Sequence, residues 1–240
     1  MKTVAIIQAR MGSSRLPGKA MIDLCGKPSL QRVLERVSKS KVDAVVVATE
    51  PKSQEILEFC SKTGTDVFIG SEDDVMCRVI EAADAFGANV VVDITGDCPL
   101  VDPELINRCV DMLLSNTELD YVSNCVPIRS YPDGMDVQVY YREVLEAVEN
   151  ITDSKSRNHV GWNIPQHPLI FNFHCIKAGT GYYRPNLRLT LDTDEDLRVI
   201  RILQKECGPD ATLKDYLIFI DTHIGLLTNQ NVRTKTPEEG

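Results

Sequence analysis

A cationic loop near the start of the chain contains residue types that bind anions. It follows the apolar run Val4–Ile7 and has two arginines, two serines, two glycines and a lysine between positions 10 and 19. Backbone N–H groups in such a loop can converge on an anion. Arg15 can fork onto phosphate oxygens, and Lys19 can act as a point charge. The loop is therefore expected to hold the phosphates of a nucleotide.

The loop follows neither of the common nucleotide-binding patterns. Five residues separate Gly12 from Gly18 where the P-loop has four, and Ala20 stands in place of the hydroxyl that binds magnesium in that motif. The G-x-G-x-x-G pattern of dinucleotide folds is also missing from this loop. What remains is the pattern R-x-x-S-S-R-x-P-G-K.

Two distant carboxylates could hold a metal ion. Asp97 follows the strongest strand pattern in the chain and comes directly after Gly96, which would let the backbone approach a ligand closely. Asp192 ends a second apolar pattern at 187–191. A carboxylate at a strand end can bind Mg²⁺ while a triphosphate supplies further oxygens. For Asp97, capping of the turn before Pro99 is the alternative interpretation.

The neighbouring acids have simpler explanations. Asp102 is expected to cap a helix that Pro103 opens, because proline is favourable in the first turn. Asp194, Glu195 and Asp196 begin another helix, where the helix dipole favours negative charge. These acids therefore need no catalytic role.

Alternating strand and helix signals position these residues. β-Branched runs predict strands, and apolar residues at i, i+3, i+4 and i+7 predict helices. Ligands bind parallel sheets of this kind beyond the carboxyl ends of the strands. The loops 8–19 and 95–102 are therefore expected to share one crevice. The pattern predicts strands at 4–7, 44–48, 67–69 and 89–94, and helices at 30–37, 53–62, 75–86 and 103–113.

After about residue 120 the alternation changes, and a smaller region extends the sheet. The tail 229–240 is polar and is expected to fray. Residues 151–168 are polar and irregular. The predicted strands are 121–123, 136–141, 169–176 and 187–191, and the predicted helices are 142–150, 194–206 and one that starts after Thr212.

Composition limits the possible partners. With 240 residues, 43% hydrophobic and 25% charged, the chain resembles an ordinary globular protein, and its net charge of −9 argues against general nucleic-acid binding. Residues 1–41 nevertheless hold nine basic and two acidic side chains, which suits a small anionic ligand. The eight cysteines include no C-x-x-C pair, so a reducing cytoplasm is expected. We expect no signal peptide and no membrane span.

Three stretches resemble the cytidylyltransferase family that makes CMP-activated sugar acids such as CMP-KDO, including the acylneuraminate enzymes. The resemblance is strongest to the branch called spore coat polysaccharide biosynthesis protein F. The stretches are Ala9–Lys19, Thr95–Leu100 and Leu189–Leu197. The resemblance implies an α/β, Rossmann-like three-layer α/β/α fold with a mixed, mostly parallel sheet of the nucleotide-diphospho-sugar transferase (GT-A-like) type. It also implies one nucleotidyltransferase domain over 1–240, in which 121–186 form a smaller acceptor and dimerisation region.

The resemblance also implies a role for individual residues. For Arg78 a solvated helix position is the alternative, and for His159 a structural role. The catalytic residues would be Arg15, Lys19, Asp97 and Asp192, of which Asp97 and Asp192 would bind the cofactor Mg²⁺. The acceptor would lie near Asp133, Asp136, Arg157 and His159. The nucleotide-binding residues would be Ala9, Arg10, Gly12, Ser13, Ser14, Arg15, Lys19, Arg78 and Asp97.

The predicted reaction transfers CMP from CTP to an acidic sugar or a related acceptor and releases pyrophosphate, in the synthesis of surface polysaccharide precursors. Thr95 and Cys98 differ from the residues common in sugar-acid enzymes, which affects the choice of acceptor more than that of nucleotide. One alternative is a GT-A glycosyltransferase that uses Asp192-Thr193-Asp194 as a D-x-D motif. Another is a non-catalytic nucleotide-binding coat or assembly protein.

The expected partners are CTP, a small-molecule acceptor and a second copy of the chain. The homodimer is expected to form through the strands at 136–141 and 169–176. Neither nucleic acid nor a membrane is expected as a partner.

Overall fold

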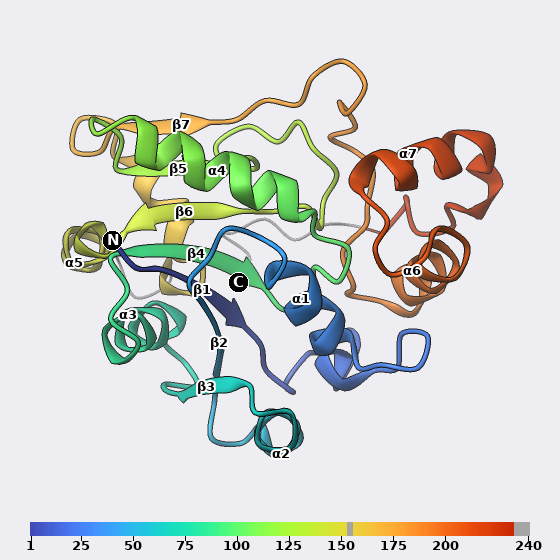
Figure 1. The fold of residues 1–240 in the computed structure, drawn as a ribbon, viewed down its shortest axis with the longest axis horizontal. Helices are drawn as coiled ribbons and strands as arrows, with labels where there is room; N and C mark the ends of the chain where they lie inside the picture. The colour runs from blue at the N-terminus through green and yellow to red at the C-terminus, as the bar shows by residue number, and fades with distance from the viewer. Residues whose placement is uncertain (153–155, 233–240) are drawn as a thin grey trace.

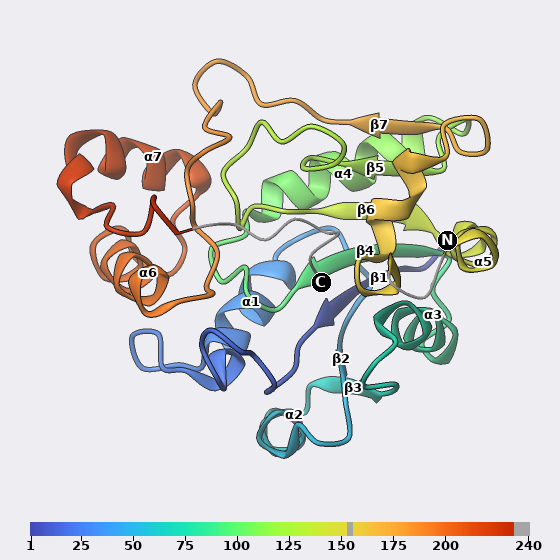
Figure 2. The same cartoon turned by 180° about the vertical axis from the view of Figure 1, so that it is seen from behind.

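A seven-stranded sheet with helices on both faces forms the centre of the computed structural model, which describes residues 1–152 and 156–232 (Figures 1 and 2). The strand order is β3-β2-β1-β4-β6-β5-β7. The first four strands in this order are parallel, β6 is antiparallel to both of its neighbours, and β5 and β7 are parallel. The strands are β1 (Thr3–Gln8), β2 (Ala44–Thr49), β3 (Asp66–Ile69), β4 (Val90–Thr95), β5 (Tyr121–Ser123), β6 (Gln138–Tyr141) and β7 (Phe173–Cys175). The mixed, mostly parallel sheet predicted from the sequence is thus confirmed.

The helices cover the two faces of the sheet in separate groups. On one face α1, α2 and α4 share an apolar core with α6 and α7, and on the other face α3 and α5 pack with η3. In Figure 1, α1 and α4 lie in front of the sheet, and Figure 2 shows η3 in front of it. The α-helices are α1 (Ser29–Val37), α2 (Gln54–Thr63), α3 (Val75–Ala85), α4 (Pro103–Ser115), α5 (Arg142–Ile151), α6 (Asp194–Cys207) and α7 (Leu213–Thr222). The 3-10 helices are η1 (Lys19–Met21), η2 (Ser156–Asn158), η3 (Val160–Gln166) and η4 (Ile224–Leu226).

The alternation of side chains along β1 explains the two cores. Ala5 and Ile7 enter the core under α1 and α4, whereas Val4 and Ile6 enter the core under α3 and α5. All four side chains are fully buried, as expected for a central strand covered on both faces. The apolar face predicted for α1 is likewise buried.

The two predicted loops lie together at the carboxyl ends of the strands because β1 and β4 are parallel neighbours. Gln8 pairs with Thr95 at the ends of these strands, and the Gly96 N–H donates to the Gln8 carbonyl at 2.8 Å. A Cβ atom at Gly96 would lie 2.9 Å from that carbonyl oxygen. Glycine is therefore required here for the close approach to the backbone of β1.

The predicted strand at 187–191 is wrong, although the segment is extended. It forms an isolated β-bridge between Asp133 and Arg188, and its other backbone hydrogen bonds are to loops. The Leu189 N–H donates to the carbonyl of Asp133 at 2.7 Å, and the Leu191 N–H donates to that of Asp97 at 2.9 Å. Because its backbone groups are used by two different loops, this segment ties those loops together and does not join the sheet.

Three further expectations need correction. The strand predicted at 169–176 is only β7, because the N–H groups of Ile170 and Phe171 donate to the carbonyl of His167 in a turn. β6 lies between β4 and β5, so its backbone is not available to pair with a second chain. The tail does not fray at Asn229, which is fully buried and donates to the carbonyl of Arg188 and to Asp196. The rest of the tail prediction, 233–240, lies outside the described residues.

A carboxylate is buried in the middle of the sheet. Asp93 of β4 accepts hydrogen bonds from Gln8 Nε2 at 2.5 Å and from the Tyr140 hydroxyl at 3.0 Å. Burial raises the pKa of Asp93 to about 6, although both hydrogen bonds act in the opposite direction. Its proton is therefore held more tightly in the folded chain than in the unfolded chain.

We expect Gly96→Ala to destabilise the protein by about 1–3 kcal/mol, because the new Cβ overpacks the junction of β1 and β4. Urea unfolding monitored by circular dichroism measures this change. Gly179→Ala is the matched control, since a Cβ there meets no atom within 4 Å. Equal stability of the two variants would contradict the close approach at Gly96.

We expect stability to depend on pH through Asp93. Its pKa is higher when folded, so the stability it contributes is complete below the unfolded value near 4 and is lost as the pH rises through 6. Between pH 5 and pH 8, the unfolding free energy of the wild type should fall by about 1.4 kcal/mol relative to Asp93→Asn. Urea titrations of both proteins across this range test it, and parallel pH profiles would refute it.

Candidate functional site

A pocket of about 230 Å³ lies at the carboxyl ends of β1 and β4, where the sequence predicts the crevice. It includes five of the predicted nucleotide-binding residues and one of the predicted acceptor residues. Its walls come from the end of β1, the turn after β4, the helix α3 and the residues that end and follow η2. The lining residues are Gln8, Ala9, Arg10, Lys19, Ala20, Val75, Arg78, Thr95, Gly96, Asp97, Asn158 and His159.

The cationic loop is held in place by local hydrogen bonds. The Met11 N–H donates to Ser53 Oγ at 2.9 Å, and the Gly18 N–H donates to the carbonyl of Met11 at 3.1 Å. Ser53 thus anchors the loop, and its side chain makes no capping bond to α2. Leu16 is buried beneath the loop. These contacts leave Gly12 and Ser14 exposed on the loop, outside the pocket lining.

Lys19 joins the two carboxylates that the sequence singles out. Its Nζ lies 2.6 Å from Asp97 and 2.7 Å from Asp192, and Arg15 lies 3.0 Å from the other oxygen of Asp192. Burial opposes the charge on Lys19, but the two carboxylates outweigh it and raise the pKa of Lys19. Burial likewise opposes ionisation of Asp97, and Lys19 nevertheless lowers the pKa of that carboxyl. All four predicted catalytic residues are therefore in one cluster of paired charges.

Arg188 supports this cluster from behind, and the sequence analysis did not identify it. Its guanidinium binds both oxygens of Asp196 at 2.8 and 3.0 Å, and also binds Asp192 at 2.9 Å and Asp133 at 3.1 Å. Only 3% of the Arg188 side chain is exposed. The position of this arginine inside the alternating apolar pattern 187–191 could have indicated that it is buried and paired. The buried arginine fixes the orientation of the Asp192 carboxylate.

Asp196 has a structural part in this network. It receives the backbone N–H groups of Asp192 and Thr193, and Thr193 caps α6 in return. Arg188 and Asn229 outweigh the effect of burial and lower the pKa of Asp196. Asp194, the third residue of the D-x-D pattern, is exposed in the first turn of α6.

Two of the predicted acceptor residues lie next to the same network. Asp133 binds Arg188, and Asp136 forms a two-fold ion pair with Arg129, which the sequence analysis also did not identify. Burial raises the pKa of Asp133 to about 6, and the negative charge of Asp136 adds to the effect. Arg188 therefore links Asp133 to the cluster around Asp192.

Of the other two predicted acceptor residues, only one lines the pocket. His159 borders the pocket at its exposed rim. Arg157 is outside the lining, because its guanidinium pairs with Asp74 at 2.6 Å and with Glu149 at 2.9 Å. These pairs connect η2 to the start of α3 and to α5.

Arg78 is not a solvated helix residue. Its side chain is buried, lines the pocket and donates from Nη1 to the carbonyl of Ser71 at 2.6 Å. Its Nε is buried with no hydrogen-bond partner among the described residues. Burial lowers the pKa of Arg78. An unmet donor at the pocket wall suits a ligand that carries hydrogen-bond acceptors.

The described residues do not form a complete metal site by themselves. Within 1–152 and 156–232, no group of three or more His, Cys, Asp or Glu side chains is placed to hold an ion. Asp97 and Asp192 nevertheless lie within hydrogen-bond distance of the same ammonium nitrogen. A cation at this place would have to take further ligands from a substrate.

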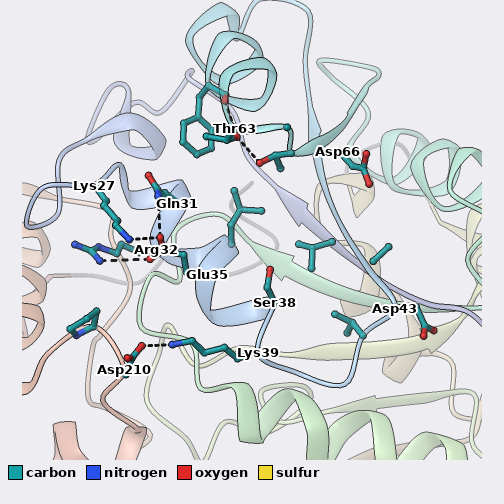
Figure 3. Close-up of a pocket in the computed structure, with 18 residues that line it drawn as sticks. Lys27, Gln31, Arg32, Glu35, Ser38, Lys39, Asp43, Thr63, Asp66 and Asp210 are labelled. Carbon is teal, nitrogen blue, oxygen red and sulfur yellow. Dashed lines mark hydrogen bonds and ion pairs between the residues drawn. The ribbon is translucent and has the colours of Figure 1, made fainter.

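A larger hollow of about 890 Å³ lies at the opposite ends of the strands, beside the amino ends of β2 and β3 (Figure 3). Within its wall Lys27 pairs with Glu35, and Lys39 pairs with Asp210. Ligand sites in such folds lie at the carboxyl ends of the strands. The smaller pocket is therefore the better candidate.

No helix in the described part of the chain is both long enough and apolar enough to cross a membrane. The family model described as cytidylyltransferase matches residues 4–213. The spore coat polysaccharide biosynthesis protein SpsF of Bacillus subtilis is 33% identical, over 90% of this chain and 92% of that protein.

Solved structures support the same relationship. A cytidylyltransferase from Leptospira borgpetersenii has a TM-score of 0.90 and 30% identity, covering 98% of this chain and all of that one. A CMP:2-keto-3-deoxy-manno-octonic acid synthetase complexed with CTP has a TM-score of 0.68 at 20% identity, over 86% of this chain and 99% of the other, which shows a shared fold. The match in sequence over most of the chain and the match in fold lead to one conclusion: the chain belongs to the cytidylyltransferase family.

Proposed function

We propose that this cytidylyltransferase moves CMP from CTP to an acidic sugar or a related acceptor, with release of pyrophosphate. The observation that carries the proposal is the cluster in which Lys19 joins Asp97 and Asp192 at the end of a cationic loop. In such a cluster the cationic side chains can bind phosphates, and the carboxylates can hold a cation that neutralises them. CTP is also named as the ligand of the synthetase that shares this fold.

In the proposed reaction an oxygen of the acceptor attacks the α-phosphorus of CTP. A new oxygen–phosphorus bond forms as the bond to the β-phosphate oxygen breaks, and pyrophosphate leaves. Arg15 and Lys19 neutralise the charge that develops on the leaving group. Arg10 lines the pocket together with Lys19. Phosphoryl-type transfers of this kind depend mainly on positioning and charge neutralisation.

The proposal includes Mg²⁺ held by Asp97 and Asp192. The donor chemistry fits, because both side chains offer hard oxygen ligands and both already contact one cationic group, Lys19. Mg²⁺ commonly takes one or two carboxylates and completes its shell with phosphate oxygens and water. When bound, it would stabilise charge on the phosphates and align the reacting groups. The buried Arg188 keeps Asp192 oriented for this role.

The acceptor is proposed to bind beside Asp133, Asp136 and His159. Asp133 contacts the network that orients Asp192, and His159 borders the pocket. A role in the synthesis of a surface polysaccharide is supported by the relative from Bacillus subtilis, which is a spore coat polysaccharide biosynthesis protein. The proposed compartment is the cytoplasm, in agreement with eight free cysteines.

We expect the protein with Mg²⁺ to release pyrophosphate from CTP, in preference to UTP, ATP and GTP, when sugar acids and amino sugar acids are offered as acceptors. Asp97→Asn should lower this rate at least about 100-fold, because one proposed ligand and its charge are lost. The matched control is Asp111→Asn, which removes only the exposed pair with Lys41 and should keep the wild-type rate.

Binding measurements separate this proposal from its alternatives. Preference for CDP- or UDP-sugars over CTP would favour the glycosyltransferase, and CTP binding without turnover on a broad acceptor panel would favour the non-catalytic protein. Normal activity of Asp97→Asn would overturn the assigned chemistry.

We also propose a homodimer that uses the β7 edge of the sheet. Leu169 and Ile170, just before β7, are exposed by 101% and 57%, and no strand of the described residues pairs with the outer side of β7. Light scattering is expected to give twice the mass of the chain, and Leu169→Asp should shift it toward the monomer. Ile224→Asp, at an exposed apolar position in η4, is the control expected to stay dimeric. A monomeric wild type would refute the dimer.

A further inference from the structure

The side-chain amide of Gln8, the last residue of β1, uses its NH₂ end in a hydrogen bond and leaves its carbonyl end available. Its Nε2 donates to Asp93 Oδ1. An ionised carboxylate can only accept hydrogen bonds, so the NH₂ end of the amide must face Asp93. No hydrogen bond to Gln8 Oε1 occurs among the described residues, and the half-buried side chain lines the pocket. The carbonyl end of the amide is thus offered to the pocket as an acceptor.

Asp93 is itself fixed in its orientation. Its second oxygen accepts from the Tyr140 hydroxyl at 3.0 Å, and only 3% of the residue is exposed. The positive charge of Arg78 on α3 also favours the ionised carboxylate. A buried carboxylate with both oxygens engaged therefore prevents the Gln8 amide from turning over.

The same pocket also presents a donor. Arg78 lines it and has a buried Nε without a partner among the described residues. Val75 and Ala9 contribute apolar wall near these two polar groups. An apolar wall with one acceptor and one donor suits a flat heterocycle that has a donor and an acceptor on one edge.

The residues proposed to bind the phosphates determine which part of the pocket is left for the base of the nucleotide. Lys19 and Asp97 line one part of the pocket and belong to the charged cluster with Asp192. If the phosphates occupy this cluster, the part lined by Gln8, Val75 and Arg78 remains for the base. A cytosine ring offers a 4-amino donor beside acceptor atoms, whereas uracil has an oxygen in place of that amino group.

We infer that the side-chain carbonyl of Gln8, oriented by Asp93, selects cytosine over uracil by accepting a hydrogen bond from the 4-amino group. This inference rests on the proposed function, since it concerns the nucleotide of that same site. Gln8 is the specificity-determining residue and Asp93 is a positioning residue. A uracil base would place its carbonyl oxygen against the Gln8 carbonyl, which leaves both acceptors without a donor.

The test is calorimetric titration of the wild type and three variants with CTP and with UTP, without acceptor. The wild type is expected to bind CTP about 10-fold or more tightly than UTP, the range for loss of a hydrogen bond in a desolvated site. Gln8→Met removes the carbonyl and should bring the ratio near one. Asp93→Asn lets the amide turn over, so its ratio should also fall several-fold. Gln54→Met makes the same change at an exposed glutamine outside the pocket lining, and it should keep the wild-type ratio.

The affinity ratio is informative because a general loss of stability lowers both affinities together. An unchanged ratio in Gln8→Met, or equal binding of CTP and UTP by the wild type, would overturn the inference. If the CTP-to-UTP affinity ratio fell in Gln8→Met but not in Asp93→Asn, the orienting role of Asp93 would be overturned. Failure of the wild type to bind CTP at all would instead refute the proposed function.

Discussion

The site depends on one buried ammonium group that two carboxylates share. Lys19 follows the cationic loop, Asp97 follows β4 and Asp192 precedes α6, so this contact joins parts of the chain up to 173 residues apart. Each partner alone would be costly to bury, because a charge that leaves water needs compensation. The raised pKa of Lys19 and the lowered pKa of Asp97 express this mutual dependence. In the proposed reaction the same arrangement would accept a nucleotide triphosphate and a divalent cation.

The surrounding structure keeps that arrangement rigid. The extended segment 187–191 donates to the loops of Asp133 and Asp97, and its arginine, Arg188, binds Asp133, Asp192 and Asp196. Gly96 lets the turn after β4 lie directly on the end of β1. Asp97, Asp133 and Asp192 are thus held by one connected set of backbone and side-chain contacts. This connection explains how a single pocket edge could serve both substrates of a transfer reaction.

Much of the first half could be predicted because its patterns are local. The β-branched runs of β1, β2 and β4 and the apolar face of α1 each specify one element without help from distant residues. The segment 187–191 has the same alternation, yet its backbone binds loops and does not join the sheet. Alternation reports which side chains are buried but not which backbone will supply the hydrogen-bond partners.

The sequence by itself determined the family and the class of fold, and it singled out Arg15, Lys19, Asp97 and Asp192, because all of these depend on short local motifs. Only the tertiary structure decided what surrounds them. Arg188, Gln8 and Asp93 have no distinctive spacing, and their roles arise from contacts made across neighbouring strands and loops. The role of a buried polar side chain depends on the group that pairs with it, and packing in three dimensions decides which group that is.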